Sequence, residues 1–210
     1  MRTITALIGT VILLGVLFSA CDSPSQKTEG YDFRQIRWGM CKANVIASEG
    51  YEPTDRADYW IWYKGITAAD LSCHLGYFIV NDTLTMARYA FTGIDLQADQ
   101  YVRKYLEIKS LLSSKYGSPV SDTAIWFKKE QRPVSMGEWI ERAWNADSDT
   151  TFDLTQSEGS SRTEWLLPRT SISLYLRNDS TGIHFGIDYT GREFARLAQK
   201  GFQDRVLKDL

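Results

Sequence analysis

Two cysteines in the body of the chain, Cys41 and Cys73, are the residues best suited to chemistry. Cys41 stands in "RWGMCKANVIASEGYEP", at the expected start of a short helix, where the helix field would lower the pKa of a free thiol. A reactive cysteine also needs a base, and the two histidines, His74 and His184, both fall in expected strands. His74 directly follows Cys73, so it points to the other side of its strand. These four residues are spaced too widely for a common metal site.

Three interpretations of the cysteine pair stay open. In an oxidising compartment, a disulfide between Cys41 and Cys73 would stabilise the fold by about 3 to 4 kcal/mol in the loop-entropy model. Two unpaired thiols in the core are the second interpretation, and a catalytic or metal-binding cysteine is the third. We expect the disulfide, which makes Cys41 a structural staple rather than a reagent.

The acidic segment from Asp147 to Glu158 has the side-chain spacing of an EF-hand calcium loop. However, Phe152 occupies the position where the sharp turn of such a loop needs glycine, and no helix is expected to lead into it. We therefore expect a solvated loop with no metal or other cofactor, and keep calcium as the weaker alternative. The candidate calcium ligands are Asp147, Asp149, Thr151, Asp153 and Glu158.

Motifs of common enzyme classes are missing from the sequence. It contains no Gly-x-Ser-x-Gly elbow, no phosphate-binding glycine loop and no His-Glu-x-x-His. Its carboxylates are scattered and suggest no catalytic pair. We expect a protein that is not an enzyme. The alternative is an enzyme or small-ligand binder with a site in the cleft between two structural units, where His74 or His184 would line the pocket.

Aromatic residues are the most informative excess, with 7 Trp, 11 Tyr and 9 Phe. In the expected strand "DYWIWY", Trp60 and Trp62 point to one side, and Tyr59 and Tyr63 point to the other. One side should pack on a helix. The other is either covered by a second layer or offered to a partner, because Trp and Tyr dominate binding hot spots. The candidate partner-contact residues are Trp60, Trp62 and Tyr77.

Periodicity supplies the elements that position these residues. The strongest helical pattern runs from Tyr101 to Tyr116 and ends at Gly117. A polar stretch, 145–161, is expected to be a loop. The other expected elements are a helix between Cys41 and Gly50, strands at 58–63, 71–80, 84–91 and 121–127, a hairpin with strands at 170–177 and 183–189, and a helix from Phe194 to the C-terminus.

One arrangement occurs twice: a helix, then glycine and proline, then an aspartate before a tryptophan-rich strand. We therefore expect an α+β fold of two tandem helix-plus-antiparallel-sheet units with a C-terminal helix, because neither copy could bury its sheet face alone. The expected boundaries are 33–96 for the first unit, 97–190 for the second and 191–210 for the C-terminal amphipathic helix.

The first residues predict export and a lipid anchor. Arg2, an apolar run and the small residues Ser19 and Ala20 before Cys21 form a secretory signal over residues 1–21. The apolar run is short for a retained anchor, since a bilayer core is about 30 Å thick. "LFSAC" resembles the lipobox of bacterial lipoproteins, in which the cysteine is acylated, although Phe18 stands where Leu is commonest. Residues 22–32 follow as a polar, flexible tether.

We therefore expect a lipid anchor at Cys21 in the cell envelope, with the protein facing the periplasm or the outer surface. Charge argues against nucleic acid as a partner. The formal net charge is −2, and no basic block occurs in the sequence.

Three stretches carry a resemblance: "FRQIRWGMCKANVIASEGYEP", "LGYFIVNDTL" and "YLEIKSLLSSKYGSPVSD". They resemble a family of uncharacterised bacterial envelope lipoproteins, whose motif is Trp-Gly-Met-Ser, then a Val-containing helix ending in Glu-Gly. Cys41 replaces the Ser of that motif. At fold level, the repeated helix and sheet are similar to beta-lactamase inhibitory protein and to SmpA/OmlA-type lipoproteins. This resemblance implies a non-catalytic protein-binding or assembly module. Together with the aromatic excess, it leads us to expect that the protein docks another envelope protein through an aromatic sheet surface.

Overall fold

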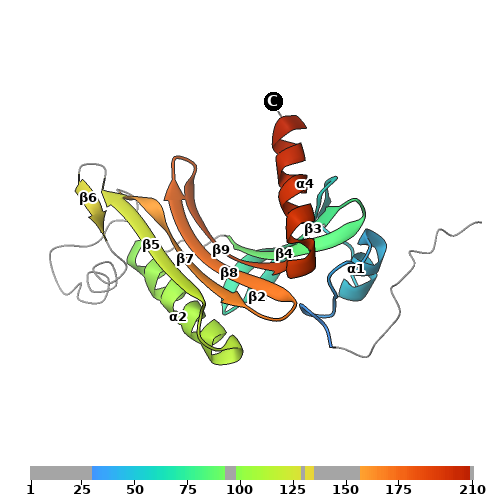
Figure 1. The fold of residues 1–210 in the computed structure, drawn as a ribbon, viewed down its shortest axis with the longest axis horizontal. Helices are drawn as coiled ribbons and strands as arrows, with labels where there is room; N and C mark the ends of the chain where they lie inside the picture. Colours follow the sequence, from blue (N-terminus) through green and yellow to red (C-terminus); the bar gives the residue numbers. More distant parts are fainter. Residues whose placement is uncertain (1–29, 93–97, 129–130, 135–156, 209–210) are drawn as a thin grey trace, which may run out of the picture.

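The fold is that of a computed structural model, which describes residues 30–92, 98–128, 131–134 and 157–208 (Figure 1). The helices are α1 (Lys42–Glu49), α2 (Ala98–Tyr116), the short 3-10 helix η2 (Arg192–Phe194) and α4 (Ala195–Lys208). The strands are β1 (Asp55–Arg56), β2 (Trp60–Ala68), β3 (Leu71–Val80), β4 (Thr83–Phe91), β5 (Ser121–Lys128), β6 (Gln131–Val134), β7 (Ser157–Leu166), β8 (Thr170–Asp179) and β9 (Gly182–Gly191).

The strands form one antiparallel sheet in the order β1-β2-β3-β4-β9-β8-β7-β5-β6. The prediction of a mixed helix-and-sheet fold is therefore confirmed. The prediction of two separate units is corrected, because β4 pairs directly with β9 and the sheet continues across the expected boundary. One buried cluster also includes residues of α1 and α2, among them Val45 and Tyr105.

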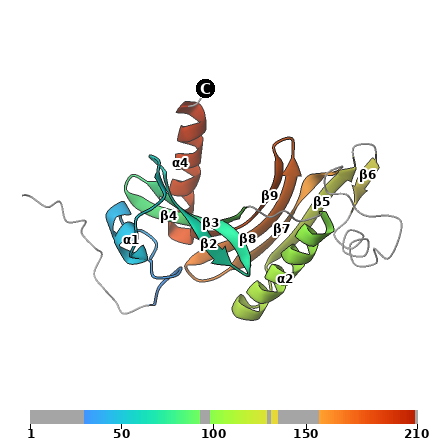
Figure 2. The ribbon, with the colours of Figure 1, turned by 180° about the vertical axis from the view of Figure 1, so that it is seen from behind.

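The two faces of the sheet differ in what covers them. Val45 of α1 and Ile108 of α2 pack in the same cluster as Leu75 of β3 and Ile187 of β9, so both helices lie on one face, which we call the α2 face. Ala198 of α4 packs in a second cluster, on the opposite face, which we call the α4 face. Figures 1 and 2 show α2 and α4 on opposite sides of the sheet.

Helix α1 begins and ends where the sequence predicts. Cys41 occupies the N-cap but makes no side-chain cap hydrogen bond. Instead, the Lys42 amide donates to Asp82 Oδ1 at 2.9 Å, so the turn between β3 and β4 caps the helix. Gly50 ends the helix in the left-handed conformation, with φ of 76°.

The Trp-Gly-Met segment has a structural role. The Trp38 indole donates to Thr170 Oγ1 at 2.9 Å and packs against Gly191, where a side chain would collide with the ring. Gly39 has φ of 88°, and its amide donates to the Leu84 carbonyl at 3.0 Å. The segment therefore ties the start of the domain to β4, β8 and the end of β9.

Strand β7 corrects the expected loop at 145–161, because Ser157 to Ser161 already belong to this strand. Its buried face carries polar residues. Ser161 Oγ accepts a hydrogen bond from the Trp126 indole at 2.9 Å, and Thr163 Oγ1 lies 2.6 Å from the Tyr105 hydroxyl. The strand is buried without an apolar alternation because these polar groups are paired.

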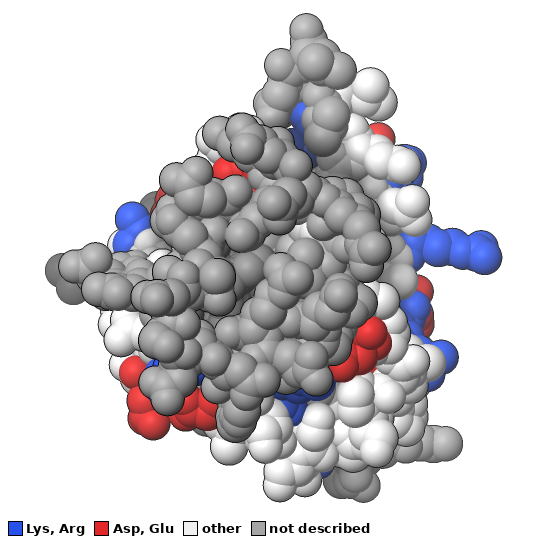
Figure 3. Space-filling model, turned by 90° about the vertical axis from the view of Figure 1, so that its left-hand side faces the viewer, with Lys and Arg blue, Asp and Glu red and all other residues white. Residues whose placement is uncertain are grey.

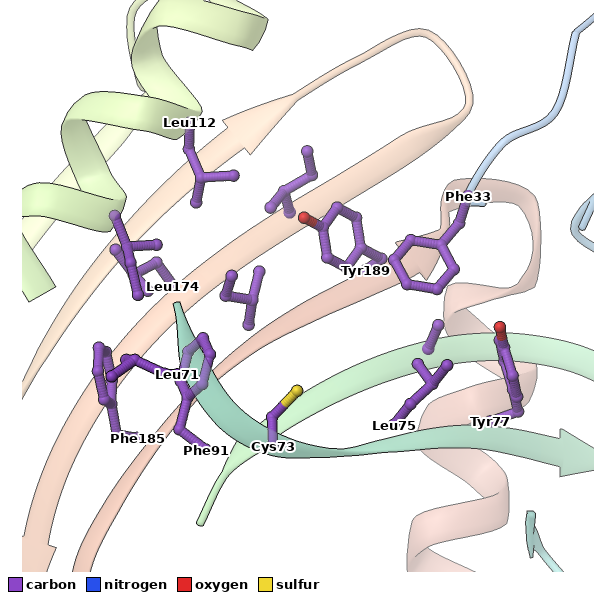
Figure 4. Packing of buried hydrophobic residues seen from close by; sticks show 14 of the residues in the cluster. Phe33, Leu71, Cys73, Leu75, Tyr77, Phe91, Leu112, Leu174, Phe185 and Tyr189 are labelled. Carbon is purple, nitrogen blue, oxygen red and sulfur yellow. The ribbon is translucent and has the colours of Figure 1, made fainter. Parts of the chain in front are cut away.

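The predicted disulfide is also corrected, because Cys41 and Cys73 are both buried and free. Cys41 adjoins Asp82, beyond the end of β3, whereas Cys73 lies near the beginning of that strand. The rise of about 3.3 Å per strand residue separates these two ends by roughly 20 Å, and a disulfide needs Cα atoms within about 7 Å. Figure 4 shows Cys73 on β3 between Leu71 and Leu75, among the buried apolar residues.

Candidate functional site

Two of the three predicted contact residues are buried in the fold. Tyr77 is 0% exposed and lies on the α2 face, and Trp60 is 5% exposed beneath α4. Neither presents a surface that a partner could contact, so this part of the prediction is corrected. Figure 4 shows Tyr77 projecting to the same side of β3 as Cys73 and Leu75.

The Tyr77 hydroxyl belongs to a polar cluster between α1 and the sheet. It donates to the Glu49 carboxylate, whose side chain is 2% exposed. Arg34 donates to the same carboxylate through Nε at 3.1 Å and Nη2 at 3.0 Å. Burial and the Glu49 carboxylate together raise the pKa of Tyr77 well above its ordinary value. These bonds satisfy a buried carboxylate and fasten the C-terminal end of α1 to β3.

A second tyrosine of this cluster is not satisfied. Tyr63 is 0% exposed, and its hydroxyl has no hydrogen-bond partner among the residues that the structure describes. Its ring packs edge-on against Tyr51, with centroids 5.0 Å apart. Burial, with a smaller contribution from Glu49, raises the pKa of Tyr63 to about 12. The cluster is thus a packed structural contact rather than an open site.

Helix α4 covers one part of the α4 face. The Phe202 ring stacks on Phe78 with centroids 4.2 Å apart, and Gly201 packs against Val80. Trp60 lies in the same cluster and stacks on Trp62 at 4.9 Å. Trp62 is only partly buried, and its six-membered ring lies against Gly76. Of the three predicted contact residues, Trp62 is therefore the one that still reaches the surface.

The part of this face beyond α4 carries a cluster of Tyr175 with three arginines, Arg88, Arg162 and Arg177, which we call the Tyr175 cluster. Arg162 of β7 lies opposite Tyr175 of β8, and Arg177 is two residues further along β8, on the same face. The Arg88 guanidinium of β4 lies 5.6 Å from the Tyr175 ring centroid and 5.5 Å from that of Trp60. The cluster thus adjoins the covered tryptophans.

Each arginine of the cluster is held by a carboxylate on a strand. Arg88 donates to both oxygens of Asp188, at 2.6 and 2.7 Å. Arg162 pairs with Glu164, and Arg177 pairs with Asp179. In each pair, the arginine Nε lies 2.9 Å from a carboxylate oxygen. Burial raises the pKa of Tyr175 to about 12; Asp188 adds to this shift, while Arg88 and Arg177 oppose it.

The histidines do not form a catalytic arrangement. His184 Nε2 lies 2.7 Å from Thr181 Oγ1 and 3.4 Å from Asp179 Oδ1, in the exposed turn between β8 and β9. Both partners approach the same ring nitrogen, whereas in a catalytic relay each of the two ring nitrogens has its own partner. His74 lies opposite Ala90 and faces away from Cys73. The expected cleft between two units is absent where β4 and β9 pair, because the sheet is continuous there.

No cluster of three or more His, Cys, Asp or Glu suited to a metal occurs in the part of the chain that the structure describes. Among the candidate calcium ligands, only Glu158 is described; it lies in β7, opposite Phe127, where an EF-hand would begin its second helix. The other four, Asp147, Asp149, Thr151 and Asp153, lie outside the described residues, as does Cys21.

Charged groups at one end of the molecule are mixed. Figure 3 shows both basic and acidic side chains among the described residues there, and neither kind gathers in one large patch. None of the described helices is both long and apolar enough to cross a membrane.

Comparisons with known proteins leave the family open. No family model matches the chain, and no curated protein matches it. Among solved structures, it is similar to an extracellular protein containing a SCP domain from Bacillus anthracis str. Ames, with a TM-score of 0.33 and 10% identity. The match covers 82% of this chain and 49% of that protein, so the chain spans about half of its length. At this TM-score the likeness carries no argument about fold or function.

Part of the Tyr175 cluster could have been predicted from the sequence. The inward alternation of Ile172, Leu174 and Leu176 places Tyr175 and Arg177 on the other side of β8. Arg88 and Arg162 gave no such indication, because their place in the cluster depends on the pairing of β4 with β9 and of β7 with β8.

Proposed function

We propose that the chain is a non-catalytic protein-binding module of the cell envelope, and that it binds its partner through the Tyr175 cluster. The observation that carries this proposal is the uneven cover of the α4 face. Helix α4 packs on β3 and β4, whereas Tyr175, Arg162 and Arg177 of the cluster lie beyond it on β7 and β8, with both arginines exposed. Tyrosine, tryptophan and arginine are the residue types that dominate binding hot spots.

The position of the cluster supports a rigid contact surface. Its residues lie on β4, β7 and β8 of one hydrogen-bonded sheet rather than on loops. Such a surface loses little conformational entropy on binding. Trp62 lies at its border with the part covered by α4, so it is the predicted contact residue that stays in this proposal.

The lipid anchor completes the proposal. The apolar start and the lipobox-like "LFSAC" support acylation of Cys21, and the residues that follow it would tether the folded part to a membrane. The expected tether, 22–32, ends before Asp32, because the Asp32 carboxylate accepts a hydrogen bond from the Trp38 amide at 2.9 Å and is 6% exposed. Labelling cells with a palmitate analogue should mark the natural protein and leave a Cys21→Ala version unmarked. Equal labelling of the two proteins would contradict the anchor.

The size of the native assembly tests the binding function. In mild-detergent extracts, the natural protein should elute with a partner, well above the size of a single chain in its micelle. Tyr175→Ala should shift it to the smaller size, whereas Leu111→Ala, at a 54% exposed position of α2, should not. Elution of the natural protein at the smaller size, or identical behaviour of the two variants, would contradict the proposal.

A further inference from the structure

The three arginines of the Tyr175 cluster share one exposure pattern. In each ion pair the arginine side chain is more exposed than its carboxylate: 58% against 35% for Arg162 and Glu164, and 54% against 35% for Arg177 and Asp179. The pair of Arg88 and Asp188 shows the same order, at 29% and 19%. The outermost charged groups here are therefore guanidinium groups.

The bonding of these arginines leaves their outer nitrogens available. Arg162 uses Nε for both Glu164 and Ser173, and Arg177 uses Nε for Asp179. Arg88 uses Nε and Nη2, which leaves Nη1 outside its pair. The terminal nitrogens of Arg162 and Arg177 donate no hydrogen bond to the residues that the structure describes. Each guanidinium is thus anchored on one edge and free on the other.

An anchored guanidinium with a free edge suits one kind of group. Its two terminal nitrogens match the two oxygens of a carboxylate, and such bidentate pairs are among the strongest charged hydrogen bonds. Because Nε already holds each side chain to the sheet, less side-chain entropy is lost on binding. Tyr175, between Arg88 and Arg162, is half-buried, and its exposed part offers an aromatic surface for the apolar part of the same ligand.

The surroundings favour a protein over a polyanion. Asp188, Glu164 and Asp179 compensate the three arginines, and the whole chain carries a formal net charge of −2. Nucleic acids and anionic membranes select surfaces with a large positive excess. A few carboxylates on a mixed protein surface need only local guanidinium groups.

We infer that the segment bound at the Tyr175 cluster is an acidic stretch of a partner protein, whose Asp or Glu carboxylates pair with the outer edges of Arg162 and Arg177. This inference rests on the proposed function and specifies the chemistry of its partner.

A peptide display library selected on the full chain in detergent provides the probe. The selected peptides should be enriched in Asp and Glu over the starting library. The strongest peptide should lose at least about tenfold in affinity when its carboxylates become amides, since hydrogen bonds to charged groups contribute about 1.5 to 3 kcal/mol. The double variant Arg162→Gln/Arg177→Gln should lose a similar factor, while Arg103→Gln, an exposed arginine of α2, should stay within about twofold.

The outcomes separate the inference from the function. Peptides that bind, depend on Tyr175 and show no acidic enrichment would overturn the inference and leave protein binding intact. If no selected peptide is sensitive to Tyr175→Ala, both are contradicted. Binding to phosphatidylglycerol vesicles or double-stranded DNA that the double variant abolishes would overturn the inference in favour of a polyanion.

Discussion

Both faces of the sheet carry a cluster of arginine, carboxylate and tyrosine side chains, but the two clusters have different roles. On the α2 face, Arg34, Glu49 and Tyr77 form a cluster around a carboxylate that is only 2% exposed, although the Arg34 side chain itself is 36% exposed. On the α4 face, the carboxylates of Glu164 and Asp179 are each 35% exposed, and the Arg162 and Arg177 side chains that pair with them are more than half exposed. Burial decides between the two roles, because a buried carboxylate must be fully paired, whereas an exposed guanidinium keeps nitrogens for another molecule.

The largest expected effect is the difference in stability between a substitution in the covered part of the α4 face and one in its open part. Trp60→Ala should lower the free energy of unfolding by about 4 kcal/mol, because a 5% exposed indole would leave a cavity beneath α4. Urea denaturation measures this change. Tyr175→Ala, in the open part, should lower it by only about 1 kcal/mol. Equal losses for the two variants would mean that both residues are core residues, and would break the comparison.

The buried carboxylate of the α2 face comes next. Glu49→Gln should lower the free energy of unfolding by about 2 kcal/mol, because the buried carboxylate makes charged hydrogen bonds with Arg34, and the 36% exposure of Arg34 weakens their contribution only in part. The control is Glu52→Gln, whose side chain is 78% exposed and pairs with Arg56 on the surface. That control should change stability by less than about 0.5 kcal/mol. A loss under 1 kcal/mol for Glu49→Gln would show that the cluster does not fasten α1.

Two neighbouring tyrosines of the α2 face, Tyr77 and Tyr63, allow a paired and an unpaired hydroxyl group to be compared. Tyr77→Phe should cost about 1.5 kcal/mol, because it removes a hydrogen bond to a charged carboxylate. Tyr63→Phe should cost nothing or stabilise slightly, because the Tyr63 hydroxyl is buried without a partner among the described residues. Chemical denaturation of both variants measures the difference. A larger loss for Tyr63→Phe would contradict the assignment.

Alkaline titration comes last, because its effect is absent near neutral pH and appears only above about pH 10. Burial raises the pKa of Tyr63 and Tyr175 to about 12, compared with about 10 in an unfolded chain. A raised pKa means that the fold favours the neutral phenol, so this stability is complete below about pH 10 and is lost as pH rises toward 12. Ultraviolet titration should show these two phenols ionising late, and Tyr63→Phe should remove part of the loss. Stability unchanged between pH 9 and 12 would contradict the burial of both.

The local elements were predictable because short-range chemistry determines them. Gly50 and Gly117 end the first two helices in left-handed conformations, and Asn81 and Asp82 adopt positive φ in the predicted turn between β3 and β4. Strand β7 was missed because its buried Ser161 and Thr163 appear polar in sequence. Their partners, Trp126 and Tyr105, are distant along the chain.

The site was less predictable, because it too depends on contacts between residues that are distant along the chain. Periodicity placed Trp60 and Trp62 on one face, but it could not indicate that α4 would pack over Trp60. The ion pair of Arg88 and Asp188 joins residues 100 positions apart, so it depends on a strand pairing that alternation does not specify. The disulfide prediction failed in the same way, because cysteine count carries no information about distance.

Site-specific photo-crosslinking tests the central claim, that the open part of the α4 face is the binding surface. A photo-reactive phenylalanine analogue would replace either Tyr175 on that face or Leu111 of α2, in cells that produce the protein. We expect a discrete adduct with another protein from position 175 and none from position 111. Adducts from position 111 alone, or from neither position, would contradict the account.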